Sequence, residues 1–129
     1  MAARNVAICL FTNLRGTAPR RNSTVPWPDV VSIHARHHVR PGKDGPLIGG
    51  YQLSGTRNNE NVVCRSLIQL DIDTEGTKDT TGRIVTVTKA APPFDSLRDH
   101  LADYEWIAAS SHWHEPNRGI HKYRITLLP

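Results

Sequence analysis

Cysteine is scarce in this sequence, and its scarcity excludes two classes of small domain. The 129 residues include two cysteines, Cys9 and Cys64. Their spacing to other cysteines and histidines does not match a zinc finger, so a structural zinc site of that kind is excluded. Both lie in apolar, strand-like segments, which predicts buried reduced thiols rather than a disulfide.

Long hydrophobic runs are also absent. No segment approaches the roughly 20 apolar residues that a membrane-spanning helix requires. The apolar stretch at residues 6–11 is too short for the core and cleavage site of a signal peptide, and we expect it to form the first strand. The sequence therefore predicts a cytoplasmic, soluble protein without a membrane partner.

Acidic residues are nearly missing from the first third of the chain. Residues 1–43 contain one acid, Asp29, against seven basic residues: Arg4, Arg15, Arg20, Arg21, Arg36, Arg40 and Lys43. The whole chain has a formal net charge of +4 and a pI near 9.4. A basic N-terminal part is typical of proteins that bind nucleic acid, although a solvated cationic surface has the same composition.

What the sequence does contain is a hydrophobic run, residues 67–73, that ends in two acids. Side chains alternate along a strand, so Asp71 and Asp73 are expected to point the same way, roughly 6.5–7 Å apart along the backbone. Ile68, Leu70 and Ile72 are then expected to face a core. Two carboxylates on one face suit Mg²⁺ or Mn²⁺, but Asp-x-Asp also occurs in ordinary turns at strand ends.

Hydrophobic periodicity predicts an α+β fold, with a mixed β-sheet and a few flanking helices, in a single domain of residues 1–129. Two helices are expected, one at residues 29–40 and a short amphipathic one that begins after Pro93. Residues 12–28, 41–61 and 74–82 are expected to be loops or turns. Strands are expected at residues 6–11, 62–73, 83–89, 105–112 and 121–128, with 62–73 as the central strand.

A second polar segment closes the strand expected at residues 105–112. Alternation predicts that Ser110, His112 and His114 share one face, with Trp113 on the other. A hydroxyl and an imidazole at the open end of a strand can both donate hydrogen bonds to phosphate oxygens. Taken alone, the same residues would fit a histidine packed beside a tryptophan at the edge of a loop.

Taken together, these segments resemble the archaeo-eukaryotic primase superfamily, in the primase-polymerase branch found on phages, plasmids and other mobile elements. That branch shows a Gly-x-Arg-Asn stretch, a strand ending in Asp-x-Asp, a Ser-x-His strand and an Arg-rich strand ending in Leu-Pro. The matching segments are residues 55–58, 70–73, 110–114 and 122–129, in that order. The resemblance covers residues 50–129.

The resemblance implies a DNA-directed primase-polymerase, a nucleotidyltransferase of DNA replication. Asp71 and Asp73 would hold the catalytic Mg²⁺ or Mn²⁺ ions. Ser110 and His112 would contact the triphosphate of the incoming nucleotide, and Arg124 would neutralise phosphate. His112 would therefore be a catalytic residue as well as a nucleotide ligand.

The resemblance also implies an RRM-like catalytic core and a set of partners. Arg57 would help to bind nucleotide or template, and the template would be single-stranded DNA. A helicase, or the C-terminal remainder of the same protein, is a further expected partner. The family needs a third acid beyond the Leu-Pro step, and Asp79 and Asp95 lie too early to match it. The resemblance thus implies a catalytic module that is incomplete at its C-terminus. It leaves open whether this chain has polymerase activity by itself.

A second histidine competes with His112 for the phosphate-binding role. Residues 118–121 resemble the Arg-Gly-x-His form of the same motif in cellular primases, which would select His121. His112 is preferred because a serine precedes it at the right offset. His121 instead shares a strand face with Tyr123 and Ile125.

Two other functions remain open at this point. His112, Trp113 and His114 form the His-hydrophobic-His signature of rolling-circle replication and relaxase endonucleases, with Tyr123 as the nearest candidate nucleophile. That alternative places the tyrosine on an apolar strand and leaves the Asp-x-Asp pair unexplained. The third possibility is a nucleic-acid-binding module that keeps the sheet but has lost the chemistry.

Overall fold

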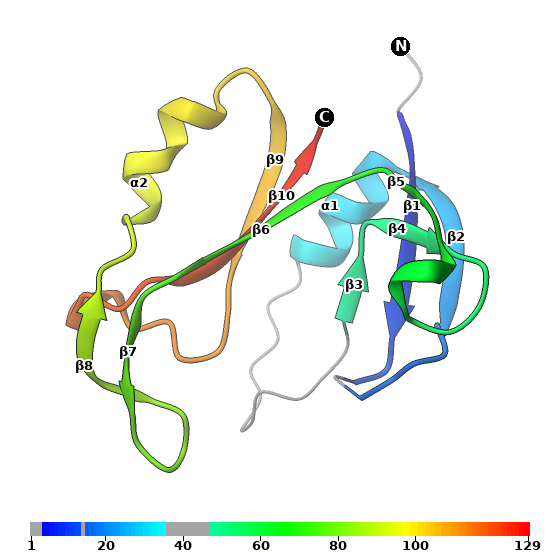
Figure 1. The fold of residues 1–129 in the computed structure, drawn as a ribbon. Helices are drawn as coiled ribbons and strands as arrows, with labels where there is room; N and C mark the ends of the chain where they lie inside the picture. The colour runs from blue at the N-terminus through cyan, green and yellow to red at the C-terminus, as the bar shows by residue number, and fades with distance from the viewer. Residues whose placement is uncertain (1–3, 14, 36–46) are drawn as a thin grey trace. The chain divides into compact units, whose positions relative to one another are not determined.

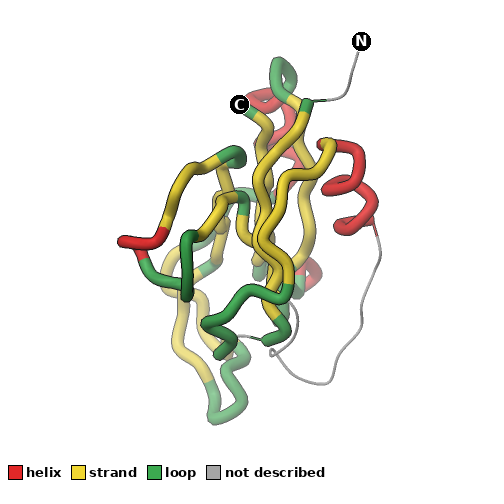
Figure 2. Tube along the Cα trace, turned by 90° about the vertical axis from the view of Figure 1, so that its right-hand side faces the viewer, coloured by secondary structure: helices red, strands yellow, loops and turns green. Residues whose placement is uncertain are grey.

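The computed structural model describes residues 4–13, 15–35 and 47–129, and the chain divides into two compact units. The first unit comprises residues 1–68 with 128–129, and the second comprises residues 69–127. Both contain short strands in small sheets, and Figure 2 shows the strands in yellow and the helices in red. The predicted α+β class is confirmed, whereas the single domain stays a prediction.

The first unit is built around strand β1, Asn5–Phe11, which lies between β2, Arg21–Pro26, and β3, Leu47–Gly49. Both neighbours run antiparallel to β1 (Figure 1). Its buried apolar side chains alternate along the strand, so both faces of β1 are covered: Val6, Ala7, Ile8, Cys9 and Phe11. The helix α1, Trp27–Ala35, follows β2 directly and buries Val30.

A hairpin of β4, Tyr51–Leu53, and β5, Val62–Arg65, completes the first unit. Leu53 packs into the same cluster as Cys9 and Phe11. A short 3₁₀ turn, Asn59–Asn61, precedes β5, and the Asn58 side chain caps it by accepting from the Asn61 amide at 3.1 Å.

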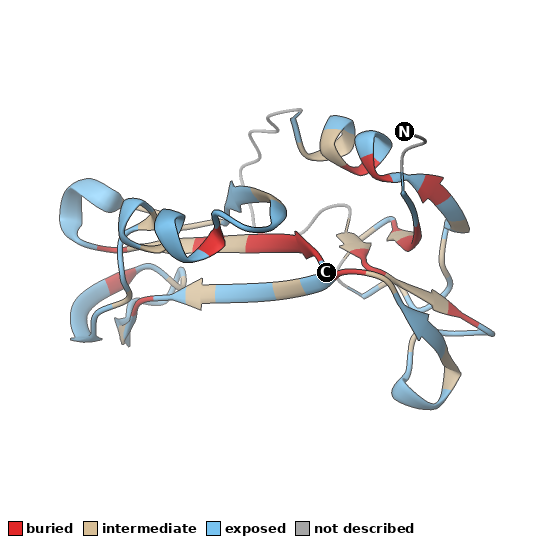
Figure 3. Cartoon of the chain, turned by 90° about the horizontal axis from the view of Figure 1, so that it is seen from above, coloured by how far each residue is buried: buried red, intermediate tan, exposed pale blue. Residues whose placement is uncertain are grey.

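The second unit holds a three-stranded sheet in the order β6-β10-β9. Its strands are β6, Ile68–Asp73, which begins at the boundary between the units, β9, Glu105–Ser110, and β10, Lys122–Leu128. On β10 the alternating residues Tyr123, Ile125 and Leu127 form a buried cluster with Leu101. Figure 3 shows the strand that runs into the C-terminus as largely buried. One face of the sheet therefore carries the core of this unit.

Two further elements belong to the second unit. The hairpin of β7, Glu75–Lys78, and β8, Ile84–Lys89, is antiparallel, and Gly76 approaches the Thr86 backbone so closely that a Cβ atom would collide with it. The helix α2, Phe94–Leu97, continues as a 3₁₀ turn, Arg98–Leu101, and both place apolar residues on the core face of the sheet.

Several predicted boundaries are wrong. Residues 62–73 form two strands in different sheets rather than one central strand, and β6 lies at the edge of its sheet. Ile68 and Leu70 are consequently exposed, and only Ile72 packs against the core cluster. The Cys64 thiol is exposed on β5, contrary to the predicted burial, whereas Cys9 is buried as predicted.

The other differences concern loops and ends. Three segments were expected to be loops or turns but contain strands. Residues 12–28 contain β2, residues 41–61 contain β3 and β4, and residues 74–82 contain β7. Strand β9 ends at Ser110, two residues before the predicted end. The first helix covers residues 27–35, and residues 36–40 of the predicted helix lie outside the described residues. Among the described residues, no helix is long and apolar enough to cross a membrane.

Candidate functional site

The two carboxylates of β6 lie on an exposed face of the sheet. Ile72, between them, packs against the core cluster, so alternation directs Asp71 and Asp73 to the opposite side. Both side chains are at least half exposed. Because β6 lies at the sheet edge and these side chains face away from the core, the charged groups keep their hydration and incur little of the desolvation cost of burial.

Strand β10 places a cation opposite each carboxylate. The Arg124 guanidinium donates to both oxygens of Asp71, from Nε to Oδ1 at 2.7 Å and from Nη2 to Oδ2 at 3.1 Å. The Lys122 ammonium lies 3.7 Å from Oδ1 of Asp73. Asp71 on β6 therefore faces Arg124 on β10, and Asp73 faces Lys122, so the two strands run in opposite directions, as in an antiparallel pair. The four side chains form what we call the acid–base face: Asp71, Asp73, Lys122 and Arg124.

The acid–base face can exchange its ion pairs for other ligands. A pair between exposed side chains contributes only about 0–1 kcal/mol, so a divalent cation can displace Arg124 from Asp71 at small cost. Within residues 4–13, 15–35 and 47–129, no group of three or more His, Cys, Asp or Glu side chains is placed to hold a metal. A metal here would have two carboxylates plus water or phosphate oxygens as ligands, which is a common arrangement for Mg²⁺.

Ser110 lies at the end of the strand on the other side of β10. The next residue, Ser111, donates its amide proton to the Lys122 carbonyl at 2.8 Å, and Lys122 in turn pairs with Asp73. The ends of β6 and β9 thus flank the start of β10. By alternation, Ser110 is on the same face of β9 as Trp106, which packs on the core face. Ser110 would therefore reach a ligand of the acid–base face only around the end of the sheet.

His112 is in a turn rather than on the strand, so the predicted shared face of Ser110, His112 and His114 is wrong. Trp113 has a φ angle of 66°, which reverses the chain after β9 ends. The His112 and Trp113 rings meet edge to face with their centroids 4.5 Å apart. The imidazole is half-buried against the indole, close in sequence to the strand end but not aligned with it.

His114 and Tyr123 are poorly placed for the endonuclease chemistry. The Nδ1 atom of His114 accepts a hydrogen bond from the Lys122 amide at 2.9 Å, which occupies one of its two metal-binding positions. Tyr123 is buried, and its hydroxyl donates to the Pro92 carbonyl at 2.8 Å. Desolvation by burial raises the pKa of the Tyr123 phenol. A nucleophilic tyrosine needs an accessible and readily deprotonated oxygen, and this one is neither.

The segment around His121 has a structural role. Arg118 binds the Glu115 carboxylate at 2.9 Å and the Ile84 carbonyl at 2.7 Å, and Arg83 binds the same carboxylate at 2.8 Å. The Thr74 hydroxyl accepts from the His121 amide at 2.9 Å. Gly119 has a positive φ of 73°, which this turn requires. Because its arginine is held in this network, residues 118–121 form a turn that positions β10.

Arg57 belongs to the first unit. Its guanidinium carbon lies 5.0 Å from the centre of the Phe11 ring, a cation–π contact, and its amide donates to the Thr17 carbonyl at 2.7 Å. These contacts join the residue 54–58 turn to the loop after β1. The predicted role of Arg57 in binding nucleotide or template stays a prediction.

Sequence reasoning missed Lys122 as a member of the site. Its signal was available, because Lys122 and Arg124 alternate with the apolar residues Tyr123 and Ile125, which places both cations on the face opposite the core. Only the register between β6 and β10 shows that these cations lie against the two aspartates. Comparisons with protein-family models, curated proteins and solved structures gave no match for this chain, so its function is argued from the chemistry of the acid–base face and its surroundings alone.

Proposed function

We propose that this chain is a primase-polymerase-type nucleotidyltransferase module with an RRM-like core. Its metal site would be the acid–base face, with Asp71 and Asp73 as carboxylate ligands for Mg²⁺ or Mn²⁺. One observation supports this most: two exposed carboxylates on one strand face lie against a guanidinium and an ammonium of the next strand. Such a face can bind a metal and its attached phosphates together, because each half has a ligand of opposite charge.

The chemistry would be template-directed nucleotidyl transfer. A divalent ion at such a site lowers the charge barrier for attack of a primer 3′-hydroxyl on the incoming triphosphate. Arg124 and Lys122 would leave the carboxylates and neutralise phosphate oxygens. Ser110 and His112 would donate hydrogen bonds to the same triphosphate around the end of β9.

The first unit would contact the single-stranded DNA template. Six arginines among its described residues carry positive charge: Arg4, Arg15, Arg20, Arg21, Arg57 and Arg65. Contacts between arginines and phosphates are sequence-independent and weaken as salt rises. A helicase, or a C-terminal segment supplying the third acid, would complete the replication machinery.

The proposal is tested first by metal binding. We expect the double variant Asp71→Asn, Asp73→Asn to bind Mn²⁺ at least about tenfold more weakly, measured by electron paramagnetic resonance of the free ion, because both charged ligands are lost. Asp103→Asn, an exposed acid in the turn before β9, is the matched control. Circular dichroism checks that each variant folds.

The results of these binding measurements distinguish the primase-polymerase from the other two candidate functions, the endonuclease and the non-catalytic nucleic-acid-binding module. Unchanged Mn²⁺ affinity in a folded double variant would contradict the proposed site. Failure of the native chain to bind Mn²⁺, together with retained binding of single-stranded DNA, would instead indicate a non-catalytic nucleic-acid-binding module. Mn²⁺ binding that depends on His112 and His114 would return the endonuclease to consideration.

Arg124 gives a second test, in which metal and phosphate respond differently. We expect Arg124→Gln to bind Mn²⁺ at least as tightly as the native chain, because a competing cation is removed from Asp71. Binding of a nucleoside triphosphate in the presence of Mn²⁺ should weaken about tenfold, because a charge-assisted hydrogen bond is lost. Calorimetry measures both, with Lys89→Gln, at the exposed end of β8, as control. Equal weakening of metal and triphosphate binding would contradict the division of roles.

A further inference from the structure

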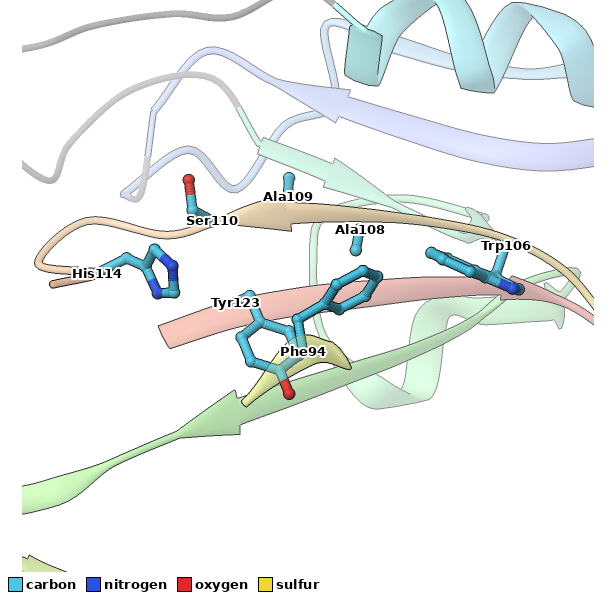
Figure 4. A pocket seen from close by; sticks show the side chains of 7 residues that line it. All are labelled: Phe94, Trp106, Ala108, Ala109, Ser110, His114 and Tyr123. Atoms are coloured by element: carbon cyan, nitrogen blue, oxygen red, sulfur yellow. The ribbon is translucent and has the colours of Figure 1, made fainter. Parts of the chain in front are cut away.

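A pocket lies on the core face of the second unit, beside the proposed phosphate-contacting residue Ser110. It has a volume of about 370 Å³, within the range of small-molecule sites. Figure 4 shows its lining side chains, which come from α2, β9, the turn after β9 and β10: Phe94, Trp106, Ala108, Ala109, Ser110, His114 and Tyr123. All seven lie in the second unit and among its described residues.

Three of the seven lining residues are Phe, Trp or Tyr, and their rings contact one another. Phe94 meets Trp106 edge to face with centroids 5.4 Å apart, and meets Tyr123 in the same way at 5.7 Å. The Tyr123 hydroxyl is held by the Pro92 carbonyl, which fixes the orientation of its ring. Rings packed against one another in this way lose little entropy when a flat ligand stacks on them.

The strand β9 supplies the smallest side chains of the wall. Ala108 and Ala109 are both exposed, and the methyl group of Ala108, on the same face of β9 as Trp106, leaves space beside that ring that a larger residue would fill. None of the seven lining residues carries a carboxylate, guanidinium or ammonium group. A phosphate would find no charge partner within the pocket, whereas an uncharged flat ring would find apolar contact.

The pocket has one polar end, formed by His114 and Ser110. Because a backbone amide can only donate, the hydrogen bond from the Lys122 amide identifies Nδ1 of His114 as the acceptor. The neutral ring therefore carries its proton on Nε2, which is left to donate. Burial, and secondarily the nearby His121, lowers the pKa of His114, which favours this neutral form. The Ser110 hydroxyl can either donate or accept.

We propose that this pocket binds a nucleobase, stacked against the aromatic wall with its polar edge hydrogen-bonded by His114 and Ser110. The aromatic wall and the uncharged polar end fit any planar heteroaromatic ring. The choice of a nucleobase among such rings rests on the proposed function, because the pocket adjoins the residue that would contact the triphosphate.

The test uses nucleosides, which have no phosphate, in the absence of metal. Adenosine and cytidine are titrated into the native chain, and the indole N–H signals of its three tryptophans are followed by nuclear magnetic resonance. We expect the Trp106 signal, assigned with Trp106→Leu, to shift most. Trp106→Leu should weaken nucleoside binding about tenfold, because stacking on its ring is lost. Tyr104→Leu, which removes an exposed aromatic ring two residues earlier, should leave binding unchanged.

A second variant, Ala108→Leu, tests the pocket independently in case Trp106→Leu does not fold. Ala108→Leu adds a side chain to the exposed wall without removing any core contact, and it should abolish nucleoside binding by filling the pocket. Nucleoside binding that survives in folded Ala108→Leu, or a native chain that binds no nucleoside, would overturn the proposal. If Mn²⁺-dependent triphosphate binding persists in that case, the pocket proposal fails and the proposed function stands. If the native chain binds nucleosides but does not bind Mn²⁺, the proposed function fails and the pocket proposal stands.

Discussion

Strands β1 and β6 differ both in sequence pattern and in environment. Six of the seven residues of β1 are apolar, whereas in β6 three apolar residues alternate with Gln69, Asp71 and Asp73. In β1, Val6 and Ile8 are 1% and 0% exposed, whereas in β6 Ile68 and Leu70 are 46% and 41% exposed. The two strands also differ in position, because β1 lies between two strands and β6 has a partner on one side in its described sheet. Sequence pattern and position therefore agree: the continuously apolar strand is buried inside its sheet, and the alternating strand lies at an edge.

The same difference determines which strand can carry charge. An ionised carboxylate among the buried residues of β1 would cost several kcal/mol unless it were paired. On β6 the carboxylates of Asp71 and Asp73 keep contact with solvent while they face the cations of β10. The edge strand is thus the one that can offer ligands to a metal.

The largest effect is expected from truncating the buried strand. Ile8→Ala should lower the free energy of unfolding of the first unit by about 2–5 kcal/mol, because it leaves a cavity at a fully buried position. Leu70→Ala, on the exposed edge strand β6 of the second unit, is the control and should lower the free energy of unfolding of that unit by less than about 1 kcal/mol. Urea denaturation followed by circular dichroism measures both. Equal losses would show that β6 is as buried as β1 in solution.

A smaller effect is expected from the ion pairs that hold the turn before β10. Hydrogen bonds from Arg83, with Arg118 beside it, lower the pKa of Glu115 from 4.5 to about 2. This depressed pKa stabilises the folded chain above pH 4.5, and the stabilisation is lost as the pH falls from about 4.5 to about 2. The native chain should therefore have a higher free energy of unfolding than Glu115→Gln at pH 6. This difference between the two chains, the stability gap, should disappear as the pH falls from about 4.5 to about 2.

This pH dependence is measured by urea denaturation at a series of pH values. The gap should also narrow at high salt, because the pairs are exposed and therefore screened. A gap that stays constant between pH 6 and pH 2 would mean that Glu115 acts through packing rather than charge. Ile8→Ala should show no such closure, which sharpens the contrast between the two units.

Elements with strong apolar periodicity could be predicted from sequence. Residues 6–11, 83–89 and 121–128 were expected to be strands, and β1, β8 and β10 occupy those positions to within one residue at each end. Their signal is strong because at least one face of each carries a run of β-branched, aliphatic or aromatic side chains. The aromatic start of α2 was found for the same reason.

Elements stabilised by pairing alone could not be predicted. Strands β2 and β7 consist mainly of polar residues, and they form because β1 and β8 offer them backbone partners. The split between β5 and β6 depends on Ser66 and Leu67, whose amides both donate to the Gly50 carbonyl. Such long-range contacts leave no local pattern, so the predicted single strand 62–73 was wrong.

The candidate site, like the strands, could be predicted only where a local sequence pattern determines it. Alternation along β6 correctly placed Asp71 and Asp73 on one face opposite Ile72. The direct contact with Arg124 depends on strand register, which sequence does not specify. His112 was misplaced because the positive φ of Trp113, a rare conformation for a bulky residue, ends the alternation early.

In the proposed function, the charges of the acid–base face would set the order in which its ligands assemble. Two carboxylates and two cations sum to zero, so without ligand this surface exerts little net electrostatic attraction on an anion. Binding one divalent ion would change that sum to +2. A triphosphate would then be drawn to the surface mainly after the metal, or together with it, and its arrival would be gated by the supply of free metal ions.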